Sequence, residues 1–334
     1  MFKFSFAGLN VHCQQASPSL LAWLKRAYPH LQLPSDAPCS LRVELHQQPP
    51  PAPPGPAEVS WDTFEGRFEK HRGGAELWLL RPQQAFCLDQ SQNILRGWVA
   101  DPASLIRYQR VKPLYLLLSI WAQQRQRTFL HAAYLAHQGR GVALVGHSGS
   151  GKSTSSLTAW WGGWDFLGDD IVAFQSDTSQ PVGFSLWAAL SLETAHLDSL
   201  CQRLQLTFEV DVESHANDKS SLFLPAAHPR LVASAPLHAW VAPTIVPGQR
   251  EARLLRCHPS DMLRALAPST MLQMMPRPHP HDFQRMAAWV ARFPCYCLQL
   301  GSDLSSIPGV LQAATTAVGP ALPTAPVGST TGGG

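Results

Sequence analysis

The stretch Gly146-His147-Ser148-Gly149-Ser150-Gly151-Lys152-Ser153 has the glycine spacing, lysine and serine of a phosphate-binding loop of the Walker A type. It follows the apolar run 142–145 and precedes a helix-compatible stretch at 154–161. Glycines let successive backbone N–H groups converge on phosphate oxygens, and the helix N-terminus behind them adds partial positive charge. The pattern therefore predicts a strand, loop and helix that bind a nucleotide. The alternative is a glycine-rich turn without a ligand.

Each residue of this loop has an expected role. The Lys152 ammonium should reach the β and γ phosphates, and the Ser153 hydroxyl should join the shell of a Mg²⁺ ion. We therefore expect ATP and Mg²⁺ as cofactors. The candidate nucleotide-binding residues are Gly146, His147, Ser148, Gly149, Ser150, Gly151, Lys152, Ser153 and Thr154.

The composition is that of a soluble globular protein and excludes several classes. The chain has 334 residues, of which 45% are hydrophobic and 15% charged, with a net charge of +3. That charge is too small and too dispersed for binding nucleic-acid phosphates, which needs clustered Lys and Arg. No run approaches the roughly 18 apolar residues of a membrane span, and the N-terminus lacks the apolar core of a signal peptide. We expect a cytoplasmic protein that binds neither nucleic acid nor membrane, with its seven dispersed cysteines reduced.

Three regions are expected along the chain. Residues 1–125 alternate between strand-like and helix-like segments and predict a mixed, β-rich N-terminal domain, with an exposed proline-rich loop at 49–56 and one apolar helix at 105–124. Residues 126–312 continue as an α/β catalytic domain. Residues 313–334 are rich in Ala, Pro, Thr and Gly and predict a disordered tail.

The α/β region carries clear strand and helix signals. A hairpin is expected from a strand at 128–136, a turn at 137–140 and a strand at 141–145. A further strand at 164–174 should end and restart around two adjacent carboxylates. Later strand signals lie near 184–192, 239–246, 252–256 and 294–300, and helix signals lie at 259–267 and 281–293.

The adjacent carboxylates Asp169 and Asp170 supply chemistry that a phosphate-binding loop lacks. A phosphoryl transfer needs a Mg²⁺ ligand and a group that orients the attacked hydroxyl or accepts its proton. Neighbouring residues of a strand point to opposite sides, so one carboxylate can serve the metal and the other the nucleophile. His131, on the strand next to the loop, could meet the reacting phosphate or an aspartate. The alternatives are an ordinary acidic strand end and a structural histidine.

The order of these motifs resembles the C-terminal catalytic domain of HPr kinase/phosphorylase. The matching stretches are 129–133, 146–153 and 168–170; His131 lies 21 residues before Lys152, and Asp169 lies 17 residues after it. The similarity is specific over about 126–176 and diffuse from there to about 312. Residues 1–125 resemble the N-terminal region of HPr-kinase-like bacterial proteins, some of which modify ribosomally made peptides such as lasso-peptide precursors.

The resemblance implies a P-loop kinase domain of the HPr kinase type. It implies that Asp169 is the base that activates a serine hydroxyl. It also implies that Asp170 either holds the metal together with Ser153 or supports Asp169, and that His131 lies beside both carboxylates. It also implies a homo-oligomer, whose contacts the N-terminal region could replace or block. His147 stands where HPr kinases often have Asp, and the glycine-rich signature that helps dock HPr has no clear match, so a substrate other than HPr stays open.

The first hypothesis is an ATP- and Mg²⁺-dependent kinase for a serine or threonine hydroxyl of a peptide or small protein, such as a ribosomal natural-product precursor peptide. Catalysis would come from positioning, metal charge and Asp169. Two alternatives stay open: a kinase for the hydroxyl of a small metabolite, and a nucleotide-gated peptide-binding module without transferase activity. A kinase needs both Lys152 and Asp169, whereas a binding module needs Lys152 alone.

Overall fold

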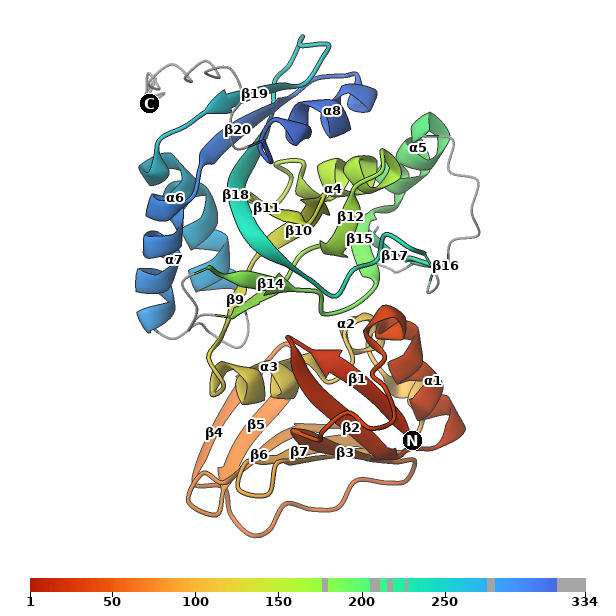
Figure 1. The fold of residues 1–334 in the computed structure, drawn as a ribbon. Helices are drawn as coiled ribbons and strands as arrows, with labels where there is room; N and C mark the ends of the chain where they lie inside the picture. The colour runs from red at the N-terminus through yellow and green to blue at the C-terminus, as the bar shows by residue number, and fades with distance from the viewer. Residues whose placement is uncertain (176–179, 205–210, 215–218, 226–227, 275–279, 317–334) are drawn as a thin grey trace, which may run out of the picture. The chain divides into compact units, whose positions relative to one another are not determined.

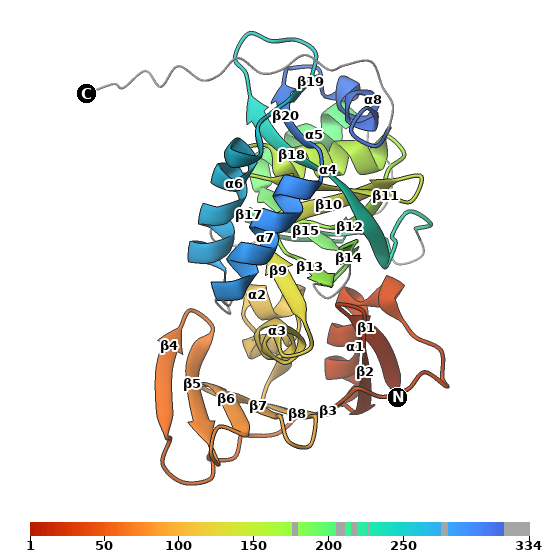
Figure 2. The same ribbon diagram turned by 60° about the vertical axis from the view of Figure 1, so that its left-hand side comes forward.

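The computed structural model describes residues 1–175, 180–204, 211–214, 219–225, 228–274 and 280–316. The chain divides into two compact units (Figure 1, Figure 2). Unit 1 comprises Met1–Arg127 with Phe184–Ala195 and Phe208–Ala233, and unit 2 comprises Thr128–Gly183, His196–Thr207 and the chain from Ser234 onward. The first break, after Arg127, lies two residues beyond the border expected from sequence. The two later segments of unit 1 fall inside the region expected to be the catalytic domain.

The elements of unit 1 are short strands and a few helices. Its strands are β1 (Phe2–Phe6), β2 (Leu9–Gln15), β3 (Leu41–His46), β4 (Val59–Thr63), β5 (Gly66–His71), β6 (Glu76–Arg81), β7 (Gln84–Asp89), β8 (Ile94–Val99), β15 (Ala189–Glu193), β16 (Asp211–Ser214) and β17 (Lys219–Phe223). Its helices are α1 (Pro18–Ala27), η1 (Pro29–Leu31), η2 (Pro102–Ser104), α2 (Arg107–Val111) and α3 (Tyr115–Gln123).

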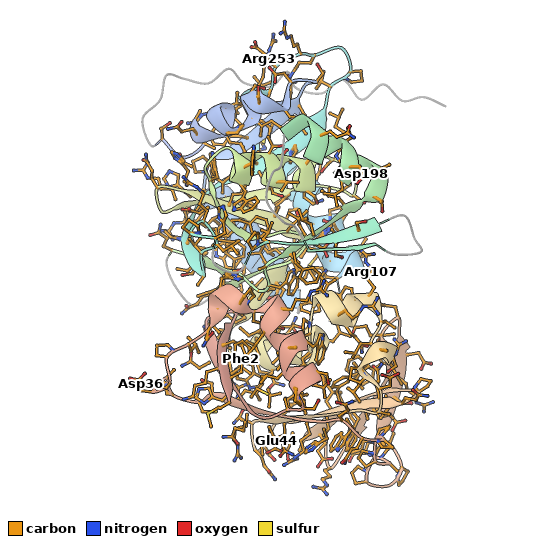
Figure 3. The ribbon with its side chains drawn as sticks, turned by 90° about the vertical axis from the view of Figure 1, so that its right-hand side faces the viewer. Phe2, Asp36, Glu44, Arg107, Asp198 and Arg253 are labelled. Carbon is orange, nitrogen blue, oxygen red and sulfur yellow. The ribbon has the colours of Figure 1, made fainter. Side chains whose placement is uncertain are left out.

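The large sheet of unit 1 has the strand order β1-β2-β3-β8-β7-β6-β5-β4, and a smaller sheet has the order β15-β17-β16. Strands β2, β3 and β8 are mutually parallel neighbours, and β8 back to β4 is an antiparallel meander. Phe2 and Glu44 point to opposite faces of the large sheet, and Glu44 pairs with Arg96 at 3.2 Å (Figure 3). The proline-rich residues 49–56 form neither helix nor strand.

Helix α1 forms because its ends and one face satisfy local rules. The Ser17 hydroxyl accepts the backbone N–H of Leu20 at 3.4 Å, and a proline occupies the first helical position, where no N–H is needed. Leu20 and Leu24, one turn apart, are buried with Trp23 on the core-facing side. The helix connects the parallel strands β2 and β3.

The prediction of a single helix at 105–124 is wrong, because this stretch forms two helices, α2 and α3. Pro113 lies at the break, and Leu114 adopts a left-handed backbone with φ of +58°. A proline disfavours helical geometry at the residue before it and lacks an N–H for the helix ladder. The apolar run therefore supports only the second helix, α3, which is nearly all buried.

Unit 2 is an α/β structure. Its strands are β9 (Arg127–Leu130), β10 (Ala132–His137), β11 (Arg140–Val145), β12 (Asp165–Gly168), β13 (Val172–Gln175), β14 (Val182–Phe184), β18 (Ser234–Ile245), β19 (Arg253–Arg256) and β20 (Cys295–Leu300). Its helices are α4 (Lys152–Trp161), most of α5 (Thr194–Leu204), α6 (Pro259–Pro268), η3 (Ser269–Gln273), α7 (Pro280–Arg292), η4 (Leu304–Ser306) and α8 (Ile307–Gln312).

The sheet of unit 2 follows the path β12-β10-β11-β18-β14-β13-β9, with β20 on β18 and β19 on β20. The strand expected at 128–136 is interrupted at His131, while the hairpin of β10 and β11 is confirmed. The strand expected at 164–174 does end and restart around the two carboxylates. The single strand expected near 184–192 is wrong, because residues 185–188 are not strand and the range divides between β14 and β15, which belong to different sheets. The other later strands and helices lie close to their expected ranges. Of the expected tail, only 313–316 are described.

The two faces of this sheet carry different layers. On one face, the Trp240 indole of β18 donates to the carbonyl of Trp289 in α7 at 3.4 Å, and the Phe174 ring lies 5.1–6.3 Å from the rings of Tyr134, Trp240 and Trp289. Pro243 points to the opposite face, three residues along the same strand, where it lies against the start of α4. The loop before α4 thus packs on the face away from the aromatic cluster. Within the described residues, no helix is both long enough and apolar enough to cross a membrane.

A glycine next to Tyr134 should be irreplaceable. A methyl group at Gly141 would lie 1.9 Å from the Tyr134 hydroxyl, which donates to the Ala235 carbonyl at 3.0 Å. We expect Gly141→Ala to lower the free energy of unfolding by about 2–3 kcal/mol in denaturant titrations, because the buried ring must move and lose its bond. The control Gly309→Ala, in α8 with nothing within 4 Å of the added methyl, should be neutral or stabilising. Equal stability of Gly141→Ala and wild type would contradict the packing.

Candidate functional site

The loop between β11 and α4 has backbone geometry that only glycine adopts freely. Gly146, Gly149 and Gly151 have φ angles of +152°, +81° and +101°. A methyl group at Gly151 would also lie 2.3 Å from Leu300 Cδ1, so this turn packs closely against β20. The strand, loop and helix expected from the sequence are therefore present, with α4 beginning at Lys152.

Lys152 lies inside this loop. Its Nζ donates to the carbonyl oxygens of Gly146 at 2.7 Å and His147 at 3.0 Å, and the side chain is buried. Burial lowers the pKa of Lys152 below its usual value, and the negative charges of Asp169 and Asp170 offset only part of this effect. The ammonium is thus held at the start of α4, within electrostatic range of both carboxylates.

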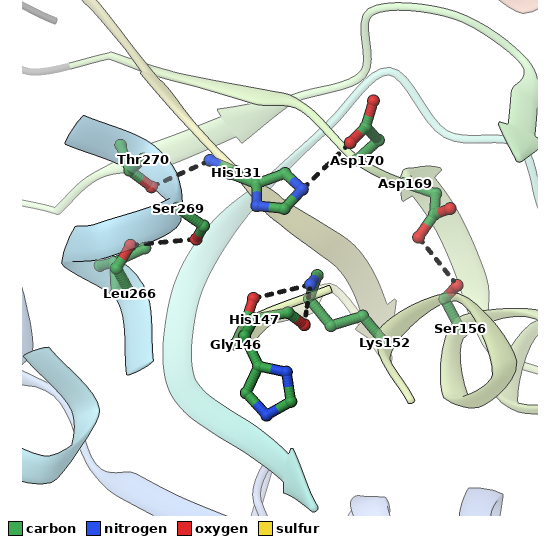
Figure 4. A network of polar contacts seen from close by, with 10 residues as sticks. All are labelled: His131, Gly146, His147, Lys152, Ser156, Asp169, Asp170, Leu266, Ser269 and Thr270. Carbon is green, nitrogen blue, oxygen red and sulfur yellow. Dashed lines mark hydrogen bonds and ion pairs between the residues drawn. The ribbon is translucent and has the colours of Figure 1, made fainter. Parts of the chain in front are cut away.

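A strained turn separates the two carboxylates. Strand β12 ends at Gly168, and the N–H of Ile171 donates to the carbonyl of Asp169 at 3.0 Å, closing a three-residue turn around Asp170. Asp170 has φ of +76°, a conformation that is rare and strained for a non-glycine residue. The turn sends Asp169 toward α4 and Asp170 toward His131 (Figure 4).

Asp169 is 1% exposed and lies against α4. Its Oδ1 accepts a long hydrogen bond from the Ser156 hydroxyl at 3.5 Å. Burial and the neighbouring charge of Asp170 raise the pKa of Asp169 to about 6, against the lowering effects of the Ser153 hydroxyl, Lys152 and His131. Its Oδ2 is buried and has no hydrogen-bond partner among the described residues. A buried carboxylate oxygen without a partner beside the Ser153 hydroxyl is suited to a cation.

His131 and Asp170 form a second arrangement on the other side of the turn. His131 Nε2 lies 3.1 Å from Asp170 Oδ1, and the Asp170 side chain is 40% exposed. Because a carboxylate only accepts, Nε2 carries the proton of this hydrogen bond. Nδ1 is buried and has no partner among the described residues. The pair therefore presents an oriented, half-exposed carboxylate.

Strand register brings these distant residues together. Ala132, the first residue of β10, pairs with Val145, the last residue before the loop. Tyr134 on the same strand pairs with Gly168, the last residue before the carboxylates. Both β11 and β12 are antiparallel to β10, so both end at the same edge of the sheet, where β10 begins. His131, Lys152, Asp169 and Asp170 converge at this edge.

The remaining loop residues differ in their exposure to solvent. His147, Ser148 and Gly149 are exposed, and His147 Nδ1 lies 2.7 Å from the carbonyl of Ser148. Ser150 is buried, and its hydroxyl has no partner among the described residues. Thr154 Oγ1 lies 2.7 Å from His196 Nε2 of α5.

Three residues of the site were not expected from sequence: Ser156, His196 and Thr270. Ser156 follows Ser153 by one helical turn, so the helical period could have suggested it. His196 and Thr270 come from α5 and η3, and the hydroxyl of Thr270 accepts the backbone N–H of His131 at 3.1 Å. No local pattern in the sequence marks either of them.

A magnesium site in a nucleotide-binding protein needs few protein ligands. Mg²⁺ keeps several waters and takes one or two carboxylates together with phosphate oxygens. In the described parts of the chain, no group of three or more His, Cys, Asp or Glu side chains could hold a metal by itself. The Ser153 hydroxyl and the buried oxygen of Asp169 fit a Mg²⁺ ion that arrives with a nucleotide.

No protein-family model matches the chain, and no curated protein matches it in sequence. Among solved structures, the chain is similar to the HPr(Ser) kinase/phosphatase from Coxiella burnetii, with 12% sequence identity and a TM-score of 0.29. The match covers 56% of this chain and 95% of that chain. Because this TM-score is low, we base the function on the geometry of the chain itself.

The buried charge of Asp169 should cost stability at neutral pH. The pKa of Asp169 is about 6 in the folded state and near 3.9 in the unfolded state. The free energy of unfolding therefore falls as the pH rises between these two values, and the full loss is reached above about pH 6. We expect Asp169→Asn to raise the free energy of unfolding at pH 7.5 by on the order of 2–3 kcal/mol, and by less than about 1 kcal/mol at pH 4.5. Urea titrations at both pH values measure the difference.

The matched control is Asp198→Asn, which changes an exposed aspartate of α5. Its difference from wild type should be small and independent of pH. An Asp169→Asn protein that is less stable than wild type at pH 7.5 would show that the ionised carboxylate is a net benefit to the fold.

Proposed function

We propose that the chain is an ATP- and Mg²⁺-dependent kinase that phosphorylates a hydroxyl group. The observation that carries this proposal is the convergence of a buried lysine, two divergent carboxylates and a histidine at one sheet edge. Such a set contains a phosphate ligand, a metal ligand and a proton acceptor, the protein groups that phosphoryl transfer requires. The loop from Gly146 to Ser153 would hold the phosphates with its backbone N–H groups at the start of α4.

The geometry favours a division of the carboxylates that differs from the one implied by family resemblance. Asp169 is buried beside the Ser153 hydroxyl and suits the metal shell, while the half-exposed Asp170, oriented by His131, suits the acceptor. When bound with the nucleotide, Mg²⁺ neutralises charge on the phosphates. Asp170 would accept the proton of the attacking hydroxyl. At the same time the hydroxyl oxygen would bond to the γ phosphorus, and the bond between that phosphorus and the leaving ADP would break.

Lys152 would exchange partners when a nucleotide binds. The loop carbonyls of Gly146 and His147 now hold its ammonium at 2.7 and 3.0 Å, in a position at the mouth of the phosphate site. Phosphate oxygens would replace these neutral acceptors with charged ones, which make stronger hydrogen bonds. Lys152 would then stabilise the charge that develops on the transferred group.

For the acceptor we propose a serine or threonine hydroxyl of a peptide or small protein, such as a ribosomally made precursor peptide. The half-exposed carboxylate of Asp170 supports an acceptor that approaches from solvent. We also propose that the protein acts in the cytoplasm, as its composition suggests, and that it forms homo-oligomers, as the resemblance to HPr kinases implies. A small-metabolite kinase and a nucleotide-gated binding module are the other outcomes that the experiment distinguishes.

Intact-mass analysis of serine-containing peptides after incubation with ATP and Mg²⁺ tests transfer. We expect a mass gain of about 80 Da, the mass of one added phosphoryl group, with the wild-type protein. Asp170→Asn should retain nucleotide affinity and lose transfer by about 10²–10⁴-fold, because it removes the proton acceptor. Asp169→Asn should lose transfer and also the increase in nucleotide affinity that Mg²⁺ brings.

Lys152→Ala should lose nucleotide binding, and Asp198→Asn should behave as wild type in every assay. Transfer only to small hydroxyl compounds would indicate a metabolite kinase. Nucleotide binding without transfer to any acceptor would indicate a binding module. Full transfer by Asp170→Asn would exclude Asp170 as the proton acceptor.

A further inference from the structure

We propose that Thr270 is a positioning residue that holds His131 against Asp170, an inference that rests on the proposed function of this site. Thr270 is fully buried in η3, and its hydroxyl oxygen accepts the backbone N–H of His131 at 3.1 Å. It lies outside the loop and the carboxylate turn. Its effect on chemistry would be exerted only through the histidine.

The contact occurs where the strand ladder is interrupted. Strand β9 ends at Leu130 and β10 begins at Ala132, so His131 stands between them. The Thr270 hydroxyl accepts the His131 N–H, which would otherwise pair with the carbonyl of a neighbouring strand. The interruption between β9 and β10 therefore leaves no unpaired backbone donor at His131. The break frees the imidazole from the side-chain alternation of a strand and lets it reach Asp170.

The helical geometry around Thr270 is itself unusual. Residues Ser269–Gln273 form a π-helical turn directly after α6, and Pro268 precedes it. Proline lacks the N–H that an α-helix would use and distorts the turn in which it lies. Single π-turns are rare and occur often at functional sites, because they reorient side chains relative to the preceding helix. Thr270, the second residue of this turn, is the one that meets His131.

A second contact anchors the same strand. The Thr128 hydroxyl of β9 donates to Asp282 Oδ1 of α7 at 2.8 Å, and Asp282 also pairs with Arg285 at 3.2 Å. The strand before His131 is thus tied to α7, and His131 itself is tied to η3. The two ties fix the backbone from which the imidazole projects toward Asp170.

The neighbouring Ser269 offers a matched comparison. Its hydroxyl donates to the Leu266 carbonyl at 3.3 Å within the helix, while Thr270 bonds to His131 (Figure 4). Both residues are buried, so removing either hydroxyl disturbs the same element. Only the change at Thr270 should be transmitted to His131.

The test combines a spectroscopic readout with transfer assays. In the wild-type protein we expect a downfield, slowly exchanging imidazole Nε2–H resonance of His131 in ¹⁵N-histidine-labelled NMR spectra, assigned by its loss in His131→Asn. Thr270→Val should lose this protection, and Thr270→Ser, which keeps the hydroxyl, should retain it. Ser269→Ala should retain it as well.

In the peptide-transfer assay, Thr270→Val should reduce kcat by about 10-fold or more, with nucleotide affinity unchanged, and Thr270→Ser should restore it. If Thr270→Val fails to fold, Thr270→Ala removes the same acceptor without added bulk. A Thr270→Val or Thr270→Ala protein that keeps the protected resonance would overturn the inference. Absence of transfer in the wild type would overturn the proposed kinase alone, because the NMR comparison does not depend on turnover.

Discussion

The burial of the Lys152 ammonium is the constraint on which the rest of the site depends. A cation removed from water must be compensated by nearby acceptors and negative charges, or its pKa falls. Two loop carbonyls supply acceptors, and Asp169 and Asp170 supply charge, but they offset burial only in part, since the pKa of Lys152 is still lowered. Glycines with positive φ angles let the loop turn its carbonyls inward toward the ammonium. The loop is therefore shaped around a positive charge.

The two carboxylates show how a strained turn can place adjacent side chains in different environments. Side by side in sequence, Asp169 and Asp170 would repel each other and titrate together if they shared one environment. The three-residue turn at Asp170 places one against α4 and the other against His131 at the half-exposed side. The arrangement stores strain and a buried charge, which is a stability cost typical of functional sites. A cation beside Asp169 would relieve part of that cost.

The site is formed at three interruptions of regular backbone: the break at His131, the loop before α4 and the turn at Asp170. All three lie at one edge of the same sheet because β11 and β12 are both antiparallel to β10. The sheet itself is held by the aromatic cluster of Tyr134, Phe174, Trp240 and Trp289 on the face opposite the loop. A strand framework thus carries short irregular segments that orient the side chains of the candidate site, an arrangement common among α/β folds.

The sequence by itself determined the local features: the strand, loop and helix around Lys152, the hairpin before it and the interrupted strand at Asp169, since glycine spacing and hydrophobic alternation act over a few residues. It placed His131, Lys152, Asp169 and Asp170 in one candidate site. The missed break at Pro113 was also local and could have been recognised. Tertiary structure alone decided which carboxylate lies by Ser153 and which by His131, and it alone brought Thr270 and His196 to the site. The division of the carboxylates depends on strand register and on the φ angle of Asp170, and Thr270 and His196 reach the site through contacts of η3 and α5. Register and tertiary contacts relate residues far apart in the chain and leave no periodic signal in the sequence.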